Sequence, residues 1–194
     1  PGGYPNKAQG PDVITEIYPW RYFSINTLKD FSIPFWNPHN FSGNPQMANF
    51  QTAIFYPFNL LYFIFPFNLS WTIIIMLQPL LAGFFMYLFL KRSVNLSKIA
   101  SFLGAVAFSF SSYITVWIEY GNIGSTLLWL PLVLLFVKRY FEKANVVNFL
   151  GISIPVIFSI LAGYIQGVFY IYILCFLYYG FLIFSKKGSI KNYR

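Results

Sequence analysis

The side chains that could carry out acid–base or metal chemistry gather in one polar stretch, residues 11–51. It holds Asp12, Glu16 and Asp30, three of the chain's five acids, together with its single histidine, His39. Asp12 and Glu16 are four residues apart, so a helix through this segment places both carboxylates on one face. A carboxylate can activate a hydroxyl as a general base or bind a divalent cation. The stretch is therefore the part of the chain in which acid–base or metal chemistry could take place.

Each of these residues also has a simpler explanation. Asp12 precedes "VITE" and could cap a helix, while Glu16 could lie on a solvated helix face. A lone histidine in a loop rich in Pro, Gly and Asn, such as His39, is often a hydrogen-bonding loop residue. Arg21 lies between Trp20 and Tyr22. Its guanidinium suits a phosphate, but the side chain could equally extend to lipid headgroups.

The composition indicates a membrane protein. The chain has 194 residues, of which 57% are hydrophobic and only 9% are charged, and its mean hydropathy is +0.59. A soluble domain has about 25% charged residues. The net charge of +8 comes from short basic clusters between apolar runs, which indicates membrane topology and argues against nucleic-acid binding. The single cysteine, Cys175, excludes a disulfide framework and a Cys-based metal site.

Several apolar runs approach the roughly 20 residues that a helix needs to cross a bilayer. The predicted transmembrane helices are 69–90, 99–118, 120–137, 146–162 and 168–184. The last two divide a charge-free run that is too long for one span, and we expect the break at 162–167, where glycines favour a turn. In the second helix, Gly104, Ala105, Ser109 and Ser111 allow close helix contact. We therefore predict an all-α polytopic membrane protein with about five transmembrane helices, 69–185, preceded by the loop 1–52.

Two features interrupt this pattern. The run 53–67 is apolar but short and contains Pro57 and Pro66, which favours an interfacial or re-entrant helix. Gln78 precedes Pro79 within the first span. We expect its amide to hydrogen-bond backbone groups that the proline kink leaves unpaired.

The basic residues predict the orientation. Ten of the thirteen bases follow the first, third and fifth predicted spans, and the last of these clusters is the basic segment 186–194. The positive-inside rule places these loops in the cytoplasm. The loop 1–52, Glu119 and the turn 162–167 then lie on the extracytoplasmic face of a multi-pass cell-membrane protein. A carboxylate at the end of a span, such as Glu119, costs free energy unless it is hydrated or paired, so it is either functional or solvated.

Several strings resemble a known family. "PDV…YPWRYF" and "IPFWNPHNFSGNPQMANFQTAIFYPFNLLY" resemble the first extracytoplasmic loop of YfhO-type bacterial membrane proteins, which belong to the GT-C group of polytopic glycosyltransferases. "LQPLLAGFFMYLFL", "WIEYGNIG" and "LAGYIQGVFY" continue the resemblance in order. It implies a GT-C-like fold with at least one preceding span, so we expect a piece of a longer protein. It also implies a polyprenyl-phosphate-linked sugar as donor, used on the outer face.

The resemblance gives the candidate residues their roles. Asp12 matches the acidic residue that, shortly after the first GT-C span, acts in catalysis or binds a divalent cation (Mg or Mn). Glu119 would support it from the second outer loop, and Arg21 would bind the donor phosphate. Glu16, His39 and Gln166 are further substrate-binding candidates, Gln166 toward a sugar hydroxyl. The acceptor would be an envelope glycopolymer or lipid.

Two other functions fit the sequence. A lipid or polymer transporter or flippase needs ionisable groups within its spans, and these spans are almost free of them. A non-catalytic envelope assembly protein would use the loop to bind a partner, with the loop aromatics in an exposed patch. The enzyme hypothesis instead predicts that Asp12 and Glu119 line one outer cavity. No P-loop, G-x-G-x-x-G or Ser–His–Asp pattern supports nucleotide-driven or hydrolytic chemistry.

Overall fold

The computed structural model describes residues 12–40 and 42–191, with side chains up to residue 185. The described residues form helices and turns without a β-strand, apart from one isolated bridge between Asn37 and Asn44. The prediction of an all-α chain is confirmed. Parts of the loop 1–52 and of the basic segment 186–194 lie outside the described residues.

Four helical runs are long and apolar enough to cross a membrane. They are α4 (Phe67–Arg92), the run Lys98–Tyr120 made of α5 (Lys98–Ser109), α6 (Ser112–Trp117) and η5 (Ile118–Tyr120), the run Ile123–Glu142 made of α7 (Ile123–Leu127) and α8 (Leu130–Glu142), and Ile165–Ser185 within α10 (Ile165–Lys191). The remaining apolar helix, α9 (Val146–Leu161), has 16 residues. At 1.5 Å per residue it is about 24 Å long, short of a hydrocarbon core of about 30 Å. Length and composition therefore support four spans where the sequence predicted about five.

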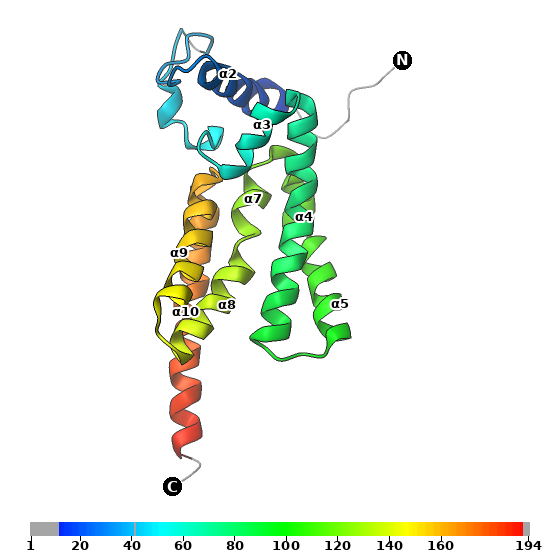
Figure 1. Cartoon of the computed structure of the whole chain (residues 1–194), viewed down its shortest axis with the longest axis vertical. Helices are drawn as coiled ribbons and strands as arrows, with labels where there is room; N and C mark the ends of the chain where they lie inside the picture. The colour runs from blue at the N-terminus through cyan, green and yellow to red at the C-terminus, as the bar shows by residue number, and fades with distance from the viewer. Residues whose placement is uncertain (1–11, 41, 192–194) are drawn as a thin grey trace.

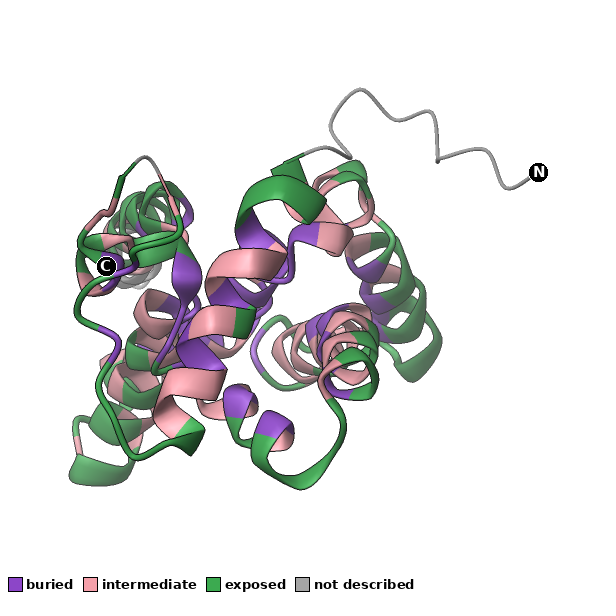
Figure 2. Cartoon of the chain, turned by 90° about the horizontal axis from the view of Figure 1, so that it is seen from above, coloured by how far each residue is buried: buried purple, intermediate pink, exposed green. Residues whose placement is uncertain are grey.

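The run Ile123–Glu142 is the central element of the bundle. α8 packs against α4, α9 and α10, while α4 packs along α5 on the other side (Figure 1). In an apolar stretch of 18 residues within this run, 56% is buried, against 17% in the corresponding stretch of α4. Seen from above, the outward faces of the peripheral helices are largely exposed (Figure 2). Because those faces carry large apolar side chains such as Leu80, Phe84, Phe102 and Phe176, they suit contact with lipid.

Small residues bring α4 and α5 into close contact, as the sequence predicted. A Cβ added at Gly104 would lie 2.4 Å from Leu90 Cδ1, and one added at Gly83 would lie 2.3 Å from Ser109 Oγ. At Gly104 the end of the Leu90 side chain would have to move, whereas at Gly83 the clash is with a hydroxyl that is hydrogen-bonded to the Ala105 carbonyl. The close approach of the first two spans is therefore most sensitive to substitution at Gly83.

The segment before the bundle is folded onto one end of it. η1 (Val13–Ile17) and α2 (Tyr18–Lys29) lie across the end at which α4 begins (Figure 1). Pro19 falls in the first turn of α2, where no backbone N–H is needed, so the helix continues through it. Ile17 packs near Tyr120 and Ile123, and Ile25 near Tyr62. These buried contacts fix α2 relative to the helices below it.

Three short 3₁₀ turns and one helical turn connect α2 to α4. They are η2 (Gln46–Ala48), η3 (Phe50–Thr52), η4 (Pro57–Leu60) and α3 (Leu61–Ile64). The Asn59 amide closes part of this connection by donating to the carbonyls of Ala53 and Ile54, at 2.6 and 3.1 Å. The helical part of 53–67 is thus two successive turns, too short to cross a bilayer. Its place at the membrane interface stays a prediction.

Gln78 has a different role from the expected one. It is buried, and its Nε2 donates to the carbonyl of Ile118 at 3.0 Å rather than to backbone groups at the Pro79 kink. The contact joins the middle of α4 to η5. Gln78 thereby helps to position Glu119 and Tyr120, which follow Ile118 directly.

Candidate functional site

A polar cavity of about 300 Å³ lies at the α2 end of the bundle, and we call it the acid cavity. Its lining comes from η1 and its N-cap, from η3, from the end of α6, η5 and the start of α7, and from the turn before α10. The lining residues are Asp12, Glu16, Ile17, Gln51, Trp117, Tyr120, Asn122, Ile123 and Tyr164. Segments more than 100 residues apart in the sequence therefore meet around Asp12 and Glu16.

Two glycines allow these segments to converge. Gly121 adopts a φ of +71° in the turn between η5 and α7, and Gly163 a φ of +91° in the turn before α10. L-residues other than glycine rarely adopt such angles. A Cβ on Gly163 would lie 2.7 Å from the carbonyl oxygen of Phe50, so its absence lets this turn approach η3. The approach brings Tyr164 and Gln51 to the same cavity.

The two carboxylates expected on one helix face, those of Asp12 and Glu16, share this cavity. Asp12 and Glu16 are both exposed and both line it. The Asp12 side chain makes no helix-capping hydrogen bond, so the capping explanation is wrong. Instead its Oδ2 accepts a long hydrogen bond of 3.4 Å from the hydroxyl of Tyr120. Asp12 thus faces Tyr120 and remains accessible to a ligand.

Glu119 does not line the acid cavity, although its neighbour Tyr120 does. The expectation that Asp12 and Glu119 line one cavity is therefore not met. Glu119 is half-buried, and its Oε1 is buried without a hydrogen-bond partner among the described residues. The hydroxyl of Tyr120 lies in the electrostatic field of Asp12, Glu119 and Glu16. Glu119 therefore adds negative charge behind the cavity wall without reaching the cavity.

Arg21 is buried, with 2% of its surface exposed, and it does not line the acid cavity. Its Nε donates to the carbonyl of Thr52 at 3.4 Å, and its guanidinium lies 5.1 Å from the ring centroid of Trp71. A Cβ on Gly121 would lie 3.0 Å from Arg21 Nη1. Since Gly121 separates Tyr120 from Asn122, the guanidinium lies directly behind the cavity wall. A phosphate inside the cavity would feel its charge but would not touch it.

The charge of Arg21 is not neutralised by an acid of the described chain. The ion pair found in the described residues is Lys138–Glu142, at 3.8 Å, and Nη2 of Arg21 is buried without a hydrogen-bond partner there. The aromatic face of Trp71 offsets part of the desolvation cost. Burial also raises the pKa of Tyr62 above its ordinary value, while the nearby Arg21 partly opposes that shift. Arg21 is thus a structural cation between α2 and the bundle.

Gln166 holds a cavity residue in place but does not line the cavity. Its Oε1 accepts from the hydroxyl of Tyr164 at 3.0 Å, and its Nε2 donates to the hydroxyl of Tyr170 at 2.5 Å. Both ends of the amide are therefore engaged within the protein. A direct contact of Gln166 with a sugar hydroxyl would require these bonds to break.

His39 lies in a different cavity, which we call the outer pocket. This pocket has a volume of about 460 Å³ between α2 and the loop that follows it. Its lining residues are Pro19, Tyr22, Phe23, Asn26, Thr27, Asp30, Asn37, His39 and Asn40. None of them lines the acid cavity. Of the predicted site residues, Asp12 and Glu16 therefore line the acid cavity and His39 the outer pocket, whereas the other three line neither.

The sequence did not reveal five polar or aromatic residues of the acid cavity, namely Gln51, Trp117, Tyr120, Asn122 and Tyr164. The Asn122 amide donates to the carbonyl of Gln51 at 3.4 Å, joining the two sides of the cavity. Uncharged polar residues at helix ends are ordinary features of membrane interfaces, so their types alone carry little information. The one local signal is "EYGNIG", in which Gly121 marks a turn flanked by Tyr120 and Asn122.

The acid cavity offers oxygen ligands that fit a small divalent cation. The described residues contain no group of three or more His, Cys, Asp or Glu side chains that could hold a metal. Mg²⁺, however, is commonly bound by one or two carboxylates together with water and substrate phosphates. Asp12 and Glu16 supply the carboxylates, and Asn122 Oδ1 is a buried oxygen without a partner among the described residues.

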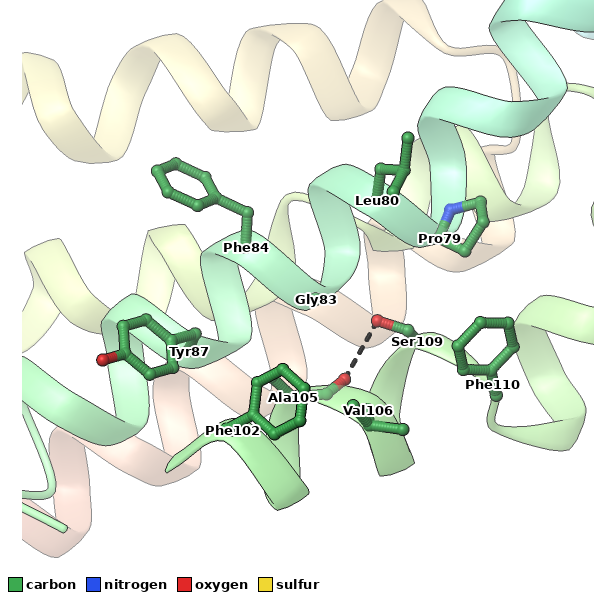
Figure 3. Close-up of a pocket in the computed structure, with 10 residues that line it drawn as sticks. All are labelled: Pro79, Leu80, Gly83, Phe84, Tyr87, Phe102, Ala105, Val106, Ser109 and Phe110. Carbon is green, nitrogen blue, oxygen red and sulfur yellow. Dashed lines mark hydrogen bonds between the residues drawn. The ribbon is translucent and has the colours of Figure 1, made fainter. Parts of the chain in front are cut away.

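A second kind of cavity lies between the spans. A groove of about 410 Å³ runs between α4 and α5, lined by apolar side chains such as Leu80, Phe84 and Phe102 (Figure 3). The hydroxyl of Ser109 points across it but donates to the carbonyl of Ala105 at 2.9 Å. No charged side chain lines the groove. The groove is therefore apolar and suits an acyl or isoprenoid chain.

The fold and the cavities define a class of protein: a helical chain with four helices able to span a membrane and a carboxylate-lined cavity at one end of the bundle. Such a chain is a multi-pass membrane protein by helix length and composition. No protein-family model matches the sequence, and comparison with curated proteins and with solved structures finds no match. The chemistry of the cavities therefore carries the functional argument.

Proposed function

We propose that this protein is a GT-C-like glycosyltransferase that transfers a sugar from a polyprenyl-phosphate donor to a cell-envelope glycopolymer or lipid acceptor. The observation that carries the proposal is the acid cavity, in which Asp12 and Glu16 face Tyr120 and Asn122 at the end of a membrane-spanning bundle. A lipid-linked donor requires a polar site next to lipid-exposed helices. The YfhO-type resemblance of residues 11–62 is what selected Asp12 from the sequence, and Asp12 lies in this cavity.

In the proposed reaction, Asp12 acts as the general base. An acceptor hydroxyl gives its proton to the carboxylate while its oxygen forms a bond to the anomeric carbon of the sugar. The bond between that carbon and the donor phosphate oxygen breaks, and polyprenyl phosphate leaves with the electron pair. The Tyr120 hydroxyl engages Oδ2 of Asp12 and so orients the carboxylate.

The negative charge of the cavity must be compensated when an anionic donor binds. Asp12, Glu16 and Glu119 all act on the same hydroxyl of Tyr120, so they lie close together. A divalent cation bound by Asp12 and Glu16 would supply positive charge to the donor phosphate. The guanidinium of Arg21, behind Gly121, contributes a fixed positive field at the same wall.

We place the acid cavity on the outer face of the cell membrane. It lies at the end where α4 begins, whereas the basic residues Lys91 and Arg92 end α4 and Lys98 begins α5 at the opposite end (Figure 1). Arg139, in the last turn of α8, belongs to the same opposite end. The positive-inside rule assigns that end to the cytoplasm.

A second function is favoured by one specific feature, the exposed aromatic tip of the loop after α2. Phe31, Ile33, Phe35 and Trp36 are 102, 54, 64 and 56% exposed. A patch of this kind on a rigid loop is typical of a partner-binding surface. It supports a non-catalytic envelope assembly protein, which would bind through this tip and would not need the acidity of Asp12.

The two functions are separated by a transfer assay on the full-length protein in liposomes, with a radiolabelled polyprenyl-phosphate sugar and crude envelope acceptor. Loss of a general base costs about 10²- to 10⁴-fold in rate. We expect a loss of that order for Asp12→Asn and full activity for Glu142→Gln, a matched change at an exposed carboxylate near the opposite end. Full activity of Asp12→Asn would refute the site assignment. No transfer by the folded wild type would favour the assembly function.

A further inference from the structure

The outer pocket is a built cavity with no role in the reaction described above. Along α2 its lining residues Pro19, Tyr22, Phe23, Asn26 and Asp30 follow one another at spacings of three, four or one, which places them on one helix face. The loop residues Asn37, His39 and Asn40 close the opposite side. Its volume of about 460 Å³ lies within the range of small-molecule sites, about 300–1,000 Å³.

A buried hydrogen-bond network holds the loop against α2 before any ligand arrives. Gln46 is fully buried, and its Nε2 donates to the carbonyl of Trp20 and to Ser24 Oγ, each at 2.9 Å. Its Oε1 accepts from Asn37 Nδ2 at 3.0 Å, while Asn37 Oδ1 accepts from the backbone N–H of His39 at 2.9 Å. The pocket wall is therefore preorganised, which lowers the entropic cost of binding.

The remaining polar groups of the lining are available to a ligand. No hydrogen bond between described residues engages the side chains of Asn26, Asp30 or Asn40, or the imidazole of His39. The two amides offer donors and acceptors, Asp30 accepts, and a neutral imidazole does both. Tyr22 and Phe23 supply aromatic surface, and the ring of His39 lies edge-on to Phe23 with a centroid distance of 5.5 Å.

This lining excludes several kinds of ligand. An anion would face the carboxylate of Asp30 without a lysine or arginine in the lining. A wholly apolar ligand would bury the amides and the carboxylate without partners, which costs free energy for each group. A metal would find only Asp30 and His39 as ligating side chains. The lining suits a neutral molecule with apolar ring faces and a rim of hydroxyls.

The geometry points to the outer pocket as a binding site for a neutral saccharide unit. We assign this saccharide to the acceptor, an assignment that rests on the proposed function, whereas the binding itself does not. Asn26 lies ten residues after Glu16, about 15 Å along the helix axis. An acceptor held in the outer pocket could therefore extend along α2 so that a further sugar reaches the acid cavity.

The test measures binding without transfer. The full-length protein in nanodiscs is titrated calorimetrically with two neutral probes at millimolar concentration, cellotetraose and tetra-N-acetylchitotetraose. We expect at least one to bind the wild type. Asn26→Ala and Tyr22→Ala should each weaken it about three- to ten-fold, the size of one lost neutral hydrogen bond or ring contact. Glu142→Gln should bind like the wild type.

Hydrogen exchange of residues 37–46 is recorded for each variant, so that loss of binding is not mistaken for loss of the loop. Absence of binding by both probes to the wild type would overturn the proposal. So would unchanged affinity in Asn26→Ala and Tyr22→Ala, or tighter binding of an anionic uronate tetramer. Binding by a wild type that shows no transfer would retain the saccharide site and refute only the proposed function.

Discussion

The acid cavity and the outer pocket are both polar hollows at the same end of the molecule, yet they are assembled differently. The acid cavity draws its lining from residues 12–17, Gln51, 117–123 and Tyr164, so it exists only when the helices are packed. The outer pocket is built within residues 19–40 and is held by Gln46. One cavity is a property of the whole bundle, and the other of one helix and its following loop.

This difference indicates which substitutions should affect one cavity and leave the other unchanged. Local regions of a protein open with their own free energies, and a loop held by a few buried hydrogen bonds can loosen while a bundle stays folded. A change within the Gln46 network should therefore act on the outer pocket alone. A change between α4 and α7 should act on the acid cavity and leave the loop intact.

The largest effect on stability is expected for Gln46→Leu. The substitution removes three hydrogen bonds and leaves the buried Asn37 amide without its partner, while the Trp20 carbonyl keeps the bond from Ser24 Oγ. We expect a local cost of about 3 kcal/mol. Hydrogen exchange in residues 37–46 should accelerate while α8 stays protected. The control is Gln166→Leu, which also breaks two hydrogen bonds but at an exposed glutamine. Equal exchange behaviour of the two variants would contradict the burial argument.

The next largest effect on stability is expected for Gly124→Ala in α7, which tests the packing around the acid cavity. The new Cβ would lie 2.0 Å from Gln78 Oε1, and Gln78 is buried and bonded to the Ile118 carbonyl. Overpacking of this kind costs about 1–3 kcal/mol. The control is Gly180→Ala in α10, where nothing lies within 4 Å of the added Cβ. Its melting temperature should be unchanged or slightly higher, because alanine favours a helix more than glycine does. Equal melting temperatures for both variants would show that the α4–α7 contact is loose.

The long apolar helices could be predicted from the sequence, because a lipid environment constrains the backbone strongly. A chain this apolar must satisfy its backbone hydrogen bonds internally, so helices at 69–90, 99–118 and 168–184 could be expected from hydropathy alone. The structure places helices there with ends that differ by a few residues. The run 120–137 begins later, at Ile123, and a turn at 128–129 divides it into α7 and α8, with Pro131 in the first turn of α8. Only the 16-residue α9 is shorter than the sequence suggested a span would be.

The candidate sites were predictable only where they are local. The pairing of Asp12 with Glu16 follows from their spacing, and both line the acid cavity. The partners Tyr120 and Tyr164 could not be found, because their approach depends on how distant turns pack. The burial of Arg21 was equally hidden, since nothing local indicates that Trp71 and Tyr62 cover it. Non-local packing decides which polar residues of a membrane chain become a site.

A third prediction concerns Tyr56, which joins the loop to the turn before α10 through Ala53 and Ala162. Burial raises the pKa of Tyr56 above its ordinary value of 10.0. Its contribution to stability is therefore complete below pH 10 and falls as the unfolded chain ionises above it, by at most about 1.4 kcal/mol per pH unit. Unfolding monitored between pH 9 and 12 should show this alkaline decline, and Tyr56→Phe should reduce it. An unchanged decline in that variant would assign it to other tyrosines.

The smallest effect is expected for Tyr120→Phe, which tests the role of Tyr120 in the acid cavity. Tyr120→Phe removes the 3.4 Å hydrogen bond to Asp12 Oδ2 and keeps the ring that packs on Trp117. Because the bond is long, we expect only a two- to five-fold loss in kcat/KM, roughly the value of one weak hydrogen bond. The transfer assay measures it, with Tyr140→Phe as the control, since that residue lies in α8 and does not line the acid cavity.

The size of the Tyr120→Phe effect decides how the acid cavity works. A small loss in kcat with an unchanged KM means that Tyr120 orients Asp12, as a positioning residue should. A loss as large as that of Asp12→Asn would mean that the proton passes through the Tyr120 hydroxyl, and the role of base would move to the pair. An unchanged kcat in Tyr120→Phe, with Asp12→Asn inactive, would mean that Tyr120 only lines the cavity. Only the first result supports the claim that the contact between Tyr120 and Asp12, two residues far apart in the sequence, helps the acid cavity to catalyse transfer.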